Sequence, residues 1–335
     1  MSHSLVVVVP ELGAEHSARL REAAARHGFE CHICMDFAQS QRFLPDAEVI
    51  LGSDVSLAGR APKLKWMCSH FAGVDPFLKE GVFASPQAIL SNSSGAYGVT
   101  ISEHIVMLLL EILRRKPEYQ KHIQERERVR RLPIRSIYGS RILMLGTGDI
   151  GQEVCRRLRA FAPSFIKGVN LHGNNPGNLF DQVQTPEKLA SLLTDTDILI
   201  ISLPGTKETF HLISTPQLSR LPDHAVIINV GRGTVVDQEA LEEELQNGRL
   251  YAGLDVFEKE PLPAESVLWD SQRAVITPHV AGDTSLPHTV DRIVDLFLEE
   301  TVHTRSPTFL NYLNSLLFNT LYQENQFPEK NICTI

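Results

Sequence analysis

The segment Gly146-Thr147-Gly148-Asp149-Ile150-Gly151 constrains this chain more than any other feature. It follows the apolar run Ile142–Leu145 and precedes a helical pattern that begins at Gln152. In such a G-x-G-x-x-G turn, the first glycine permits the tight turn, the second lets a pyrophosphate approach the backbone, and the third lets the helix pack against the strand. A purely structural turn is the alternative. The strand before it and the helix after it favour dinucleotide binding, with N–H groups at the helix start facing the phosphates.

The bulk composition is that of an ordinary acidic enzyme. The chain has 335 residues, 43% of them hydrophobic, which is enough for two domains with sizeable cores. A net charge of −8 argues against nucleic acid as a partner. No signal-peptide pattern is present and no apolar run reaches the ~18 residues of a membrane span, so we expect a cytoplasmic protein without a membrane partner. Cys31 and Cys34 form a C-x-x-C on a predicted strand, where they would face opposite sides; neither a redox centre nor a metal site is expected.

Strand-like and helix-like segments alternate along the whole chain. Continuous apolar runs bounded by helical patterns are typical of parallel sheets covered on both faces, so the fold class is α/β with two doubly wound parallel-sheet domains. The predicted strands are 5–10, 29–34, 49–52, 63–68, 88–90, 142–145, 165–171, 197–203, 225–230, 250–256 and 274–277. The main predicted helices are 16–27, 101–113 (apolar at Ile101, Ile105, Met107, Leu108 and Ile112) and 284–300.

These elements divide into two domains and a tail. We expect a first domain from residues 1–98 plus 281–310, a second from 99–280, and an atypical C-terminal tail at 311–335. The apolar spacing within Phe309–Phe318 allows an amphipathic helix that is too short to span a membrane. The charged segment Glu118–Arg131 could bind polyanions, but its mixed signs favour a solvated helix or a dimer-contact arm.

Chemistry-bearing residues follow three successive strands of the second domain. Arg232 lies between two glycines, where a guanidinium can grip a carboxylate with two parallel hydrogen bonds. The acids Asp255, Glu258 and Glu260 follow the next strand, and His279 follows the one after. Ligands of open α/β sheets bind outside the carboxyl ends of the strands. A histidine there can give a proton to a ketone that receives a hydride, and a neighbouring carboxylate would orient it.

Several motifs in this order resemble the D-isomer-specific 2-hydroxyacid dehydrogenases, the family of glyoxylate/hydroxypyruvate reductases and of D-lactate and phosphoglycerate dehydrogenases. The resemblance spans roughly residues 5–300. Its matching segments are Gly146–Gly151, Asn229–Gly233, Leu254–Pro261, Thr277–Gly282, Ala72–Asp75 and Ser102–His104. It implies a flavodoxin-like substrate-binding lid domain and a Rossmann NAD(P)-binding domain.

The resemblance also implies a role for each matching residue. Arg232 would bind the substrate carboxylate and carbonyl, His279 would be the acid/base, and Glu260 its carboxylate partner, which leaves Glu258 exposed. Residues implied to bind the cofactor are Gly146, Gly148, Asp149, Ile150, Gly151, Asn170, Pro204, Thr209, Val230, Gly231, Asp255 (on the nicotinamide carboxamide) and Gly282. Residues implied to bind the substrate are Ala72, Gly73, Val74, Arg232 and His279.

The chain departs from the family pattern at four places. Asn92-Ser93-Ser94-Gly95 stands where a Pro-Gly usually follows the asparagine, which bears on the substrate. Val129 takes the place of a tryptophan often found in the dimer arm, and the tail after Glu300 does not match.

The fourth departure concerns the cofactor. An NAD site places an acid at the end of the second strand, about 20 residues past the glycines, to accept from the ribose 2′-OH. That place falls on Asn170, and no acid follows until Asp181. Asn170, His172 and Asn174 could donate to a 2′-phosphate, although no arginine is present. We therefore expect NAD(P)H as the cofactor, with NADP(H) modestly favoured.

The sequence thus predicts a homodimeric, NAD(P)-dependent oxidoreductase that interconverts a 2-keto acid and a D-2-hydroxy acid by hydride transfer. One alternative is a dehydrogenase acting on a related acid such as a phosphonate. Another is a dinucleotide-sensing protein like the corepressors that resemble this family, which would bind the cofactor but turn over keto acids poorly.

Overall fold

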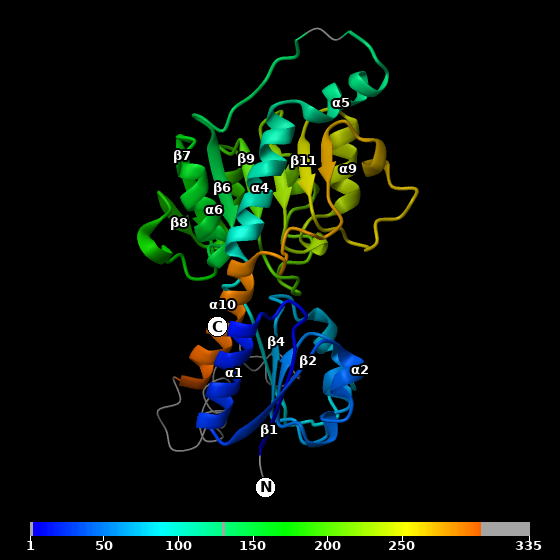
Figure 1. Cartoon of the computed structure of the whole chain (residues 1–335). Coiled ribbons are helices and arrows are strands. Elements are labelled where there is room, and N and C mark those ends of the chain that lie inside the picture. Colours follow the sequence, from blue (N-terminus) through cyan, green and yellow to red (C-terminus); the bar gives the residue numbers. More distant parts are fainter. Residues whose placement is uncertain (1–2, 129–130, 303–335) are drawn as a thin grey trace. The chain divides into compact units, whose positions relative to one another are not determined.

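The computed structural model describes residues 3–128 and 131–302. The chain forms two compact units (Figure 1). Of the described residues, the first comprises 3–96 and 284–302, and the second comprises those within Tyr97–Asp283.

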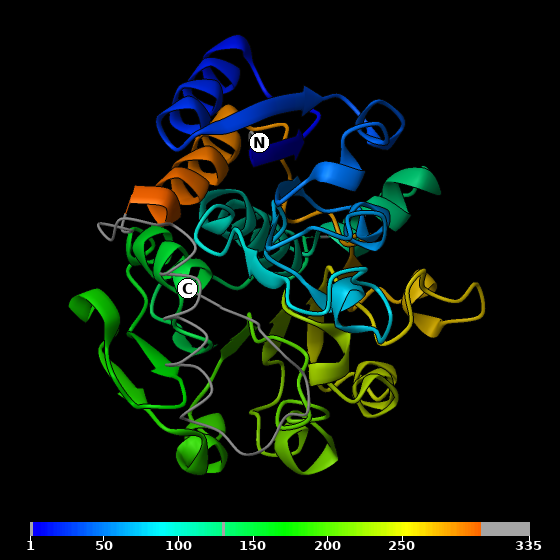
Figure 2. The ribbon, with the colours of Figure 1, turned by 90° about the horizontal axis from the view of Figure 1, so that it is seen from below.

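The first unit is built on a five-stranded parallel sheet in the order β2-β1-β3-β4-β5, the flavodoxin-like order. Its strands are β1 (His3–Val8), β2 (Phe29–Cys34), β3 (Val49–Gly52), β4 (Trp66–Ser69) and β5 (Ile89–Asn92). Its helices are α1 (Ala14–Arg26), α2 (Phe37–Ser40), α3 (Val55–Gly59) and α10 (Pro287–Val302). Helix α10 runs beside α1 (Figure 2), and the Phe297 ring of α10 stacks on Trp66 of β4 at 5.0 Å. The returning chain therefore completes the core of this unit.

The second unit is built on a seven-stranded parallel sheet in the order β12-β11-β10-β9-β6-β7-β8. Its strands are β6 (Arg141–Leu145), β7 (Phe165–Val169), β8 (Gln182–Gln184), β9 (Ile198–Ile201), β10 (Val226–Asn229), β11 (Tyr251–Leu254) and β12 (Ala274–Ile276). Its helices are α4 (Gly98–Leu113), α5 (Lys116–Gln124), α6 (Asp149–Arg159), α7 (Leu189–Leu193), α8 (Thr215–Leu218) and α9 (Gln238–Gln246). The strand order reverses between β6 and β9, which is the topological switch point of a Rossmann sheet. The predicted fold class, two doubly wound parallel-sheet units, is confirmed.

Helices on both faces explain why the strands are continuously apolar. All four residues of β9 are buried, and those of β10 are too. Helix α4 packs on β10, β11 and α6, and a stripe of Ile101, Ile105, Leu108 and Ile112 is buried on it. Met107, which the sequence placed on that stripe, is 40% exposed, because at two residues from Ile105 it points to a different side of the helix. Strand β8 went unpredicted, since Gln182-Val183-Gln184 is a short polar edge strand without an apolar run.

The charged segment after α4 begins with α5. Glu118 of α5 is buried and pairs with Arg115, whose Nε lies 2.8 Å from the Glu118 Oε1. Val129 and the tail at 311–335, both singled out in the sequence, lie outside the described residues. Within the described residues, no helix combines the length and the apolarity that crossing a bilayer requires. Cys31 and Cys34 are free thiols, and burial raises the pKa of Cys31 to about 11, which disfavours its reactive thiolate form.

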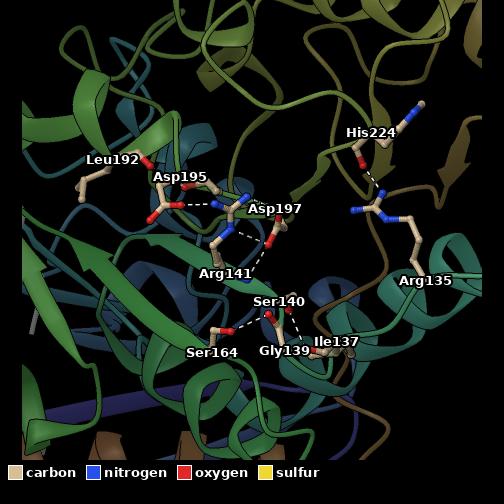
Figure 3. Close-up of polar contacts among 11 residues, drawn as sticks. Arg135, Ile137, Gly139, Ser140, Arg141, Ser164, Leu192, Asp195, Asp197 and His224 are labelled. Atoms are coloured by element: carbon tan, nitrogen blue, oxygen red, sulfur yellow. Dashed lines mark hydrogen bonds and ion pairs between the residues drawn. The ribbon is translucent and has the colours of Figure 1, made fainter.

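At the amino edge of the large sheet, Arg141 joins β6 to β9 (Figure 3). Its Nε and Nη2 donate to the two carboxylate oxygens of Asp197 at 3.0 and 2.8 Å, and its backbone N–H donates to the same carboxylate at 2.9 Å. Nη1 donates to Asp195. Hydrogen bonds from Arg141 hold the pKa of Asp197 below its usual value. The pair fixes the start of the strand that carries the glycine turn.

Replacing Asp197 by Asn should lower the free energy of unfolding at neutral pH by about 1–3 kcal/mol, since hydrogen bonds to a charged group are lost. A lowered folded-state pKa contributes stability that is complete above the unfolded value and is lost as pH falls through the folded value. The deficit of the variant should therefore stay constant from neutral pH down to about pH 4, near the ordinary value of 3.8, and shrink below it. Urea unfolding at several pH values checks this, with Asp223→Asn, 76% exposed at its side chain, as a control. A deficit independent of pH would contradict the assignment.

Candidate active site

The glycine turn leaves room for a cofactor where the sequence predicts it. Gly146, at the end of β6, has φ +94°, and a side chain there would lie 2.9 Å from the Ser202 Oγ. A Cβ on Gly151 would lie 2.3 Å from the Gly146 carbonyl oxygen, so α6 packs tightly against the turn. A Cβ on Gly148, in contrast, would meet nothing within 4 Å. Gly148 is also the N-cap residue of α6, and no side chain caps this end of the helix. Open space beside an uncapped helix start is what a pyrophosphate requires, so these residues fit a dinucleotide.

Asn170 directly follows β7, and its side chain makes hydrogen bonds to the glycine turn and to the loop after β7. Its Nδ2 donates to the Thr147 Oγ1 at 2.6 Å and to the Asn174 carbonyl at 2.8 Å, while its Oδ1 accepts from the His172 N–H at 3.0 Å. Asn170 thus joins the glycine turn to the loop after β7. The next acid, Asp181, accepts from the Ile166 N–H and pairs with Arg159. Because Ile166 lies at the beginning of β7, Asp181 sits toward the amino edge of the sheet, away from the end that Asn170 marks.

Arg232 lies on the turn after β10, and the side chain of the last residue of that strand makes hydrogen bonds that hold the turn. The buried Asn229 side chain accepts from the Gly231 N–H at 3.1 Å and donates to the Arg232 carbonyl at 3.0 Å. The half-buried Arg232 donates from Nη1 to the Gly231 carbonyl at 2.8 Å. A Cβ on Gly233 would lie 1.9 Å from the carbonyl carbon of Phe257. The arginine turn therefore lies directly against the loop after β11.

That loop brings Glu260 to His279. The Glu260 Oε2 lies 2.7 Å from the His279 Nδ1, and its Oε1 accepts from the Phe257 N–H at 3.0 Å. The His279 side chain is 46% exposed, so its other ring nitrogen can be reached by a ligand. Glu258, two residues earlier, instead pairs with His211 at 2.7 Å and accepts from the Gln238 N–H. The two glutamates of this motif thus have separate partners, and Glu258 is exposed as expected.

Asp255 is almost completely buried, at 1% exposure. Its Oδ1 accepts from the Thr277 hydroxyl at 2.6 Å and from the Val280 N–H at 2.9 Å, and its Oδ2 accepts from the Ala281 N–H at 2.9 Å. The carboxylate holds the loop that carries His279. Its predicted contact with the nicotinamide carboxamide stays a prediction.

The remaining predicted cofactor residues lie on the loops after β9, β10 and β12. The Thr209 hydroxyl donates to the Pro204 carbonyl at 2.6 Å and closes the loop after β9. Val230 is buried beside Gly231, and Gly282 is exposed. Since every strand of this sheet is parallel, these loops share its carboxyl edge with the glycine turn, Arg232 and His279.

The predicted substrate residues Ala72, Gly73 and Val74 belong to the first unit and follow β4. The Asn92 Nδ2 donates to the Ala72 carbonyl at 2.7 Å, and the Ser93 N–H donates to the Phe71 carbonyl at 3.3 Å. The end of β5 thus supports the loop. The sequence did not assign this supporting role to Asn92, nor any role to Thr277 and His104, because their hydrogen bonds join residues far apart in the chain. It also assigned no role to Asn229, whose hydrogen bonds are made within the turn that follows it.

A doubly wound sheet with a glycine turn at its switch point, together with a second α/β unit, is typical of a dinucleotide-dependent oxidoreductase. The model of the D-isomer specific 2-hydroxyacid dehydrogenase NAD binding domain matches residues 106–281. Glyoxylate/hydroxypyruvate reductase B of Serratia proteamaculans is 30% identical over 289 residues, 83% of this chain and 88% of that protein.

Solved structures agree with the sequence comparison. A D-isomer specific 2-hydroxyacid dehydrogenase family protein from Aeromonas salmonicida has a TM-score of 0.74 at 28% identity, over 90% of this chain and 95% of that one. The NADPH-dependent glyoxylate/hydroxypyruvate reductase of Sinorhizobium meliloti, in complex with NADP and sulfate, has a TM-score of 0.69 at 27% identity, over 91% and 94%. This chain belongs to the D-isomer specific 2-hydroxyacid dehydrogenase family. It is an NAD(P)-dependent enzyme that interconverts a 2-keto acid and a D-2-hydroxy acid by hydride transfer.

Replacing Glu260 by Gln should lower kcat for keto acid reduction. His279 is the predicted acid/base, and the Glu260 Oε2, 2.7 Å from its Nδ1, holds the ring in place. A neutral amide makes a weaker hydrogen bond than a carboxylate, so the ring is held less firmly and kcat should fall by about ten- to 100-fold. Glu258→Gln is the matched control, since Glu258 pairs with His211, and its kcat should stay near the wild-type value. An equal loss in both variants, or a loss in neither, would contradict the assignment of Glu260.

Proposed function

We propose that this protein reduces a small 2-keto acid, of the glyoxylate and hydroxypyruvate kind, to the D-2-hydroxy acid. The observation that carries the proposal is the Glu260–His279 pair at 2.7 Å, with an exposed imidazole on the sheet edge that also holds the glycine turn and Arg232. An imidazole held next to a cofactor site can donate a proton to a ketone while that ketone receives a hydride. Relatives named glyoxylate/hydroxypyruvate reductase support this substrate class.

Each residue then has a distinct task. Bound NAD(P)H supplies the hydride at the keto carbon. The His279 Nε2 gives its proton to the keto oxygen, while Glu260 holds Nδ1 and so orients the ring. The Arg232 guanidinium binds the carboxylate and offsets negative charge that develops on the keto oxygen. Substrate binding by Gly73 and Val74 of the first unit stays a prediction.

We also propose a modest preference for NADP(H). In place of a carboxylate at the end of β7 stands the neutral Asn170, and Asp181 is held by Arg159 toward the opposite edge. A 2′-phosphate would therefore meet no negative charge from either residue. The Sinorhizobium relative is described as NADPH-dependent, which supports the same preference.

A homodimer is proposed from the exposed apolar side chains around α4 and α5. Met107 and Leu110 lie three residues apart on one side of α4 and are 40% and 37% exposed. Ile123 on α5 is 62% exposed, and Tyr138, before β6, is 75% exposed. An apolar surface of this kind is typical of an interface, and closed two-fold dimers are the commonest assemblies. The cytoplasmic location likewise stays a proposal.

The decisive assay offers glyoxylate, hydroxypyruvate, pyruvate and branched 2-keto acids with NADH and with NADPH. We expect turnover of at least one small keto acid, with kcat/KM for NADPH equal to or above that for NADH. His279→Ala should reduce turnover by about two to four orders of magnitude. Asn170→Asp, which introduces the ribose-binding acid, should shift preference toward NADH.

Each outcome bears on a different part of the proposal. Tight dinucleotide binding without turnover of any keto acid would favour a corepressor-like sensor, and near wild-type turnover in His279→Ala would remove the mechanism. A tenfold advantage for NADH in the wild-type protein would overturn the cofactor preference alone.

Sedimentation at micromolar concentration should show a species of twice the 37.4 kDa chain mass. Leu110→Lys should shift it toward the monomer, because a charge would be buried in the interface. Val267→Lys, at an exposed apolar site outside this region, is the control and should leave the dimer intact. A wild-type protein that sediments only as a single chain would rule the dimer out.

A further inference from the structure

His104, on the second turn of α4, lies against the loop that carries His279. Its Nε2 is 2.9 Å from the Thr277 Oγ1 and 3.6 Å from the Asp255 Oδ1. The side chain is 13% exposed, and burial lowers its pKa despite the attraction of Asp255, so the imidazole is neutral near neutral pH. No step of the proposed reaction uses it.

The proton positions in this group follow from its donors and acceptors. Both oxygens of Asp255 accept backbone N–H groups, an arrangement that suits the ionised carboxylate, which can only accept. The single hydroxyl hydrogen of Thr277 therefore goes to the Asp255 Oδ1, at 2.6 Å. The Thr277 oxygen can then only accept from His104, so the His104 Nε2 carries the hydrogen. The result is one directed chain of hydrogen bonds, from His104 through Thr277 to Asp255.

Asp255 connects this chain to the backbone around His279. Its side chain accepts from Val280 and Ala281, and its carbonyl oxygen accepts from the His279 N–H at 2.7 Å. His279 itself has φ +54°, a left-handed conformation that is uncommon for a residue with a side chain and that persists only when neighbours hold it. The buried carboxylate supplies that hold, and His104 and Thr277 orient the carboxylate.

We propose that His104 is a positioning residue for the catalytic histidine: its Nε2–H, acting through the Thr277 hydroxyl and the Asp255 carboxylate, fixes the loop on which His279 meets Glu260. The inference rests on the proposed role of His279. It adds a residue of α4, outside the loops of the carboxyl edge, to the apparatus that sets the catalytic geometry. Since misplacing a reacting group by about 1 Å can cost on the order of 100-fold in rate, the effect should appear in kcat.

The test compares His104→Leu, which removes the donor, with His104→Gln, whose amide nitrogen lies the same number of bonds from Cα as Nε2. His104→Leu should lower kcat for keto acid reduction by about ten- to 100-fold and leave the KM for NADPH nearly unchanged. His104→Gln should recover most of that loss. Thr277→Val should behave like His104→Leu, and the double variant should be no slower than the slower single variant, because both remove the same chain.

Folding and general effects are separated by controls. Melting temperature and NADPH affinity are measured for every variant, and His288→Leu, at an exposed histidine of α10, should retain wild-type kcat. A His104→Leu protein with wild-type kcat, a His104→Gln protein as slow as His104→Leu, or rate losses of His104→Leu and Thr277→Val that multiply in the double variant would each overturn the proposal. If His279→Ala retains turnover, the proposed function fails first. If His279→Ala is inactive and His104→Leu is not, only the positioning role fails.

Discussion

The parallel direction of every strand in the larger sheet is the constraint on which the rest of this molecule depends. Parallel strands deliver all their carboxyl ends to one edge, so residues far apart in the chain arrive there together. The glycine turn follows β6, Asn170 follows β7, and Arg232, Asp255 and His279 follow β10, β11 and β12. A single antiparallel strand would send its terminal side chains to the opposite edge. The burial of both faces under helices is what permits this arrangement, and it explains the unbroken apolar strands.

Each carboxylate at this edge has a separate task, which depends on how deeply it is buried and on the residue with which it pairs. Glu260 faces a half-exposed imidazole, which it orients through a contact of 2.7 Å. Asp255 is buried, and its carboxylate accepts hydrogen bonds from Thr277, Val280 and Ala281, so it anchors the loop that carries His279. Glu258 faces His211 and the start of α9. Acidic side chains thus have a chemical, an anchoring and a peripheral setting within six positions of the sequence.

The opposite edge of the sheet carries an interaction that joins neighbouring strands. Arg141 binds Asp197 with two parallel hydrogen bonds at the starts of β6 and β9, the strands that flank the switch point. These bonds hold the two strands together at their amino ends, while the glycine turn and the predicted site residues lie at the carboxyl ends of the sheet.

The sequence by itself determined the fold class, most strands and the residues at their ends, because apolar runs and glycine turns are local signals that burial and backbone geometry impose directly. It did not reveal β8, whose three residues, two of them polar, join the sheet only because β7 offers a free edge. It named both Glu258 and Glu260, and the family resemblance paired Glu260 with His279; only the tertiary structure showed that Glu258 pairs with His211. It named the His104 motif without a purpose, since 173 residues separate His104 from its partner Thr277. Hydrogen bonds between distant residues leave no periodic trace in a sequence, so the contacts that hold His279 in place were decided by packing alone.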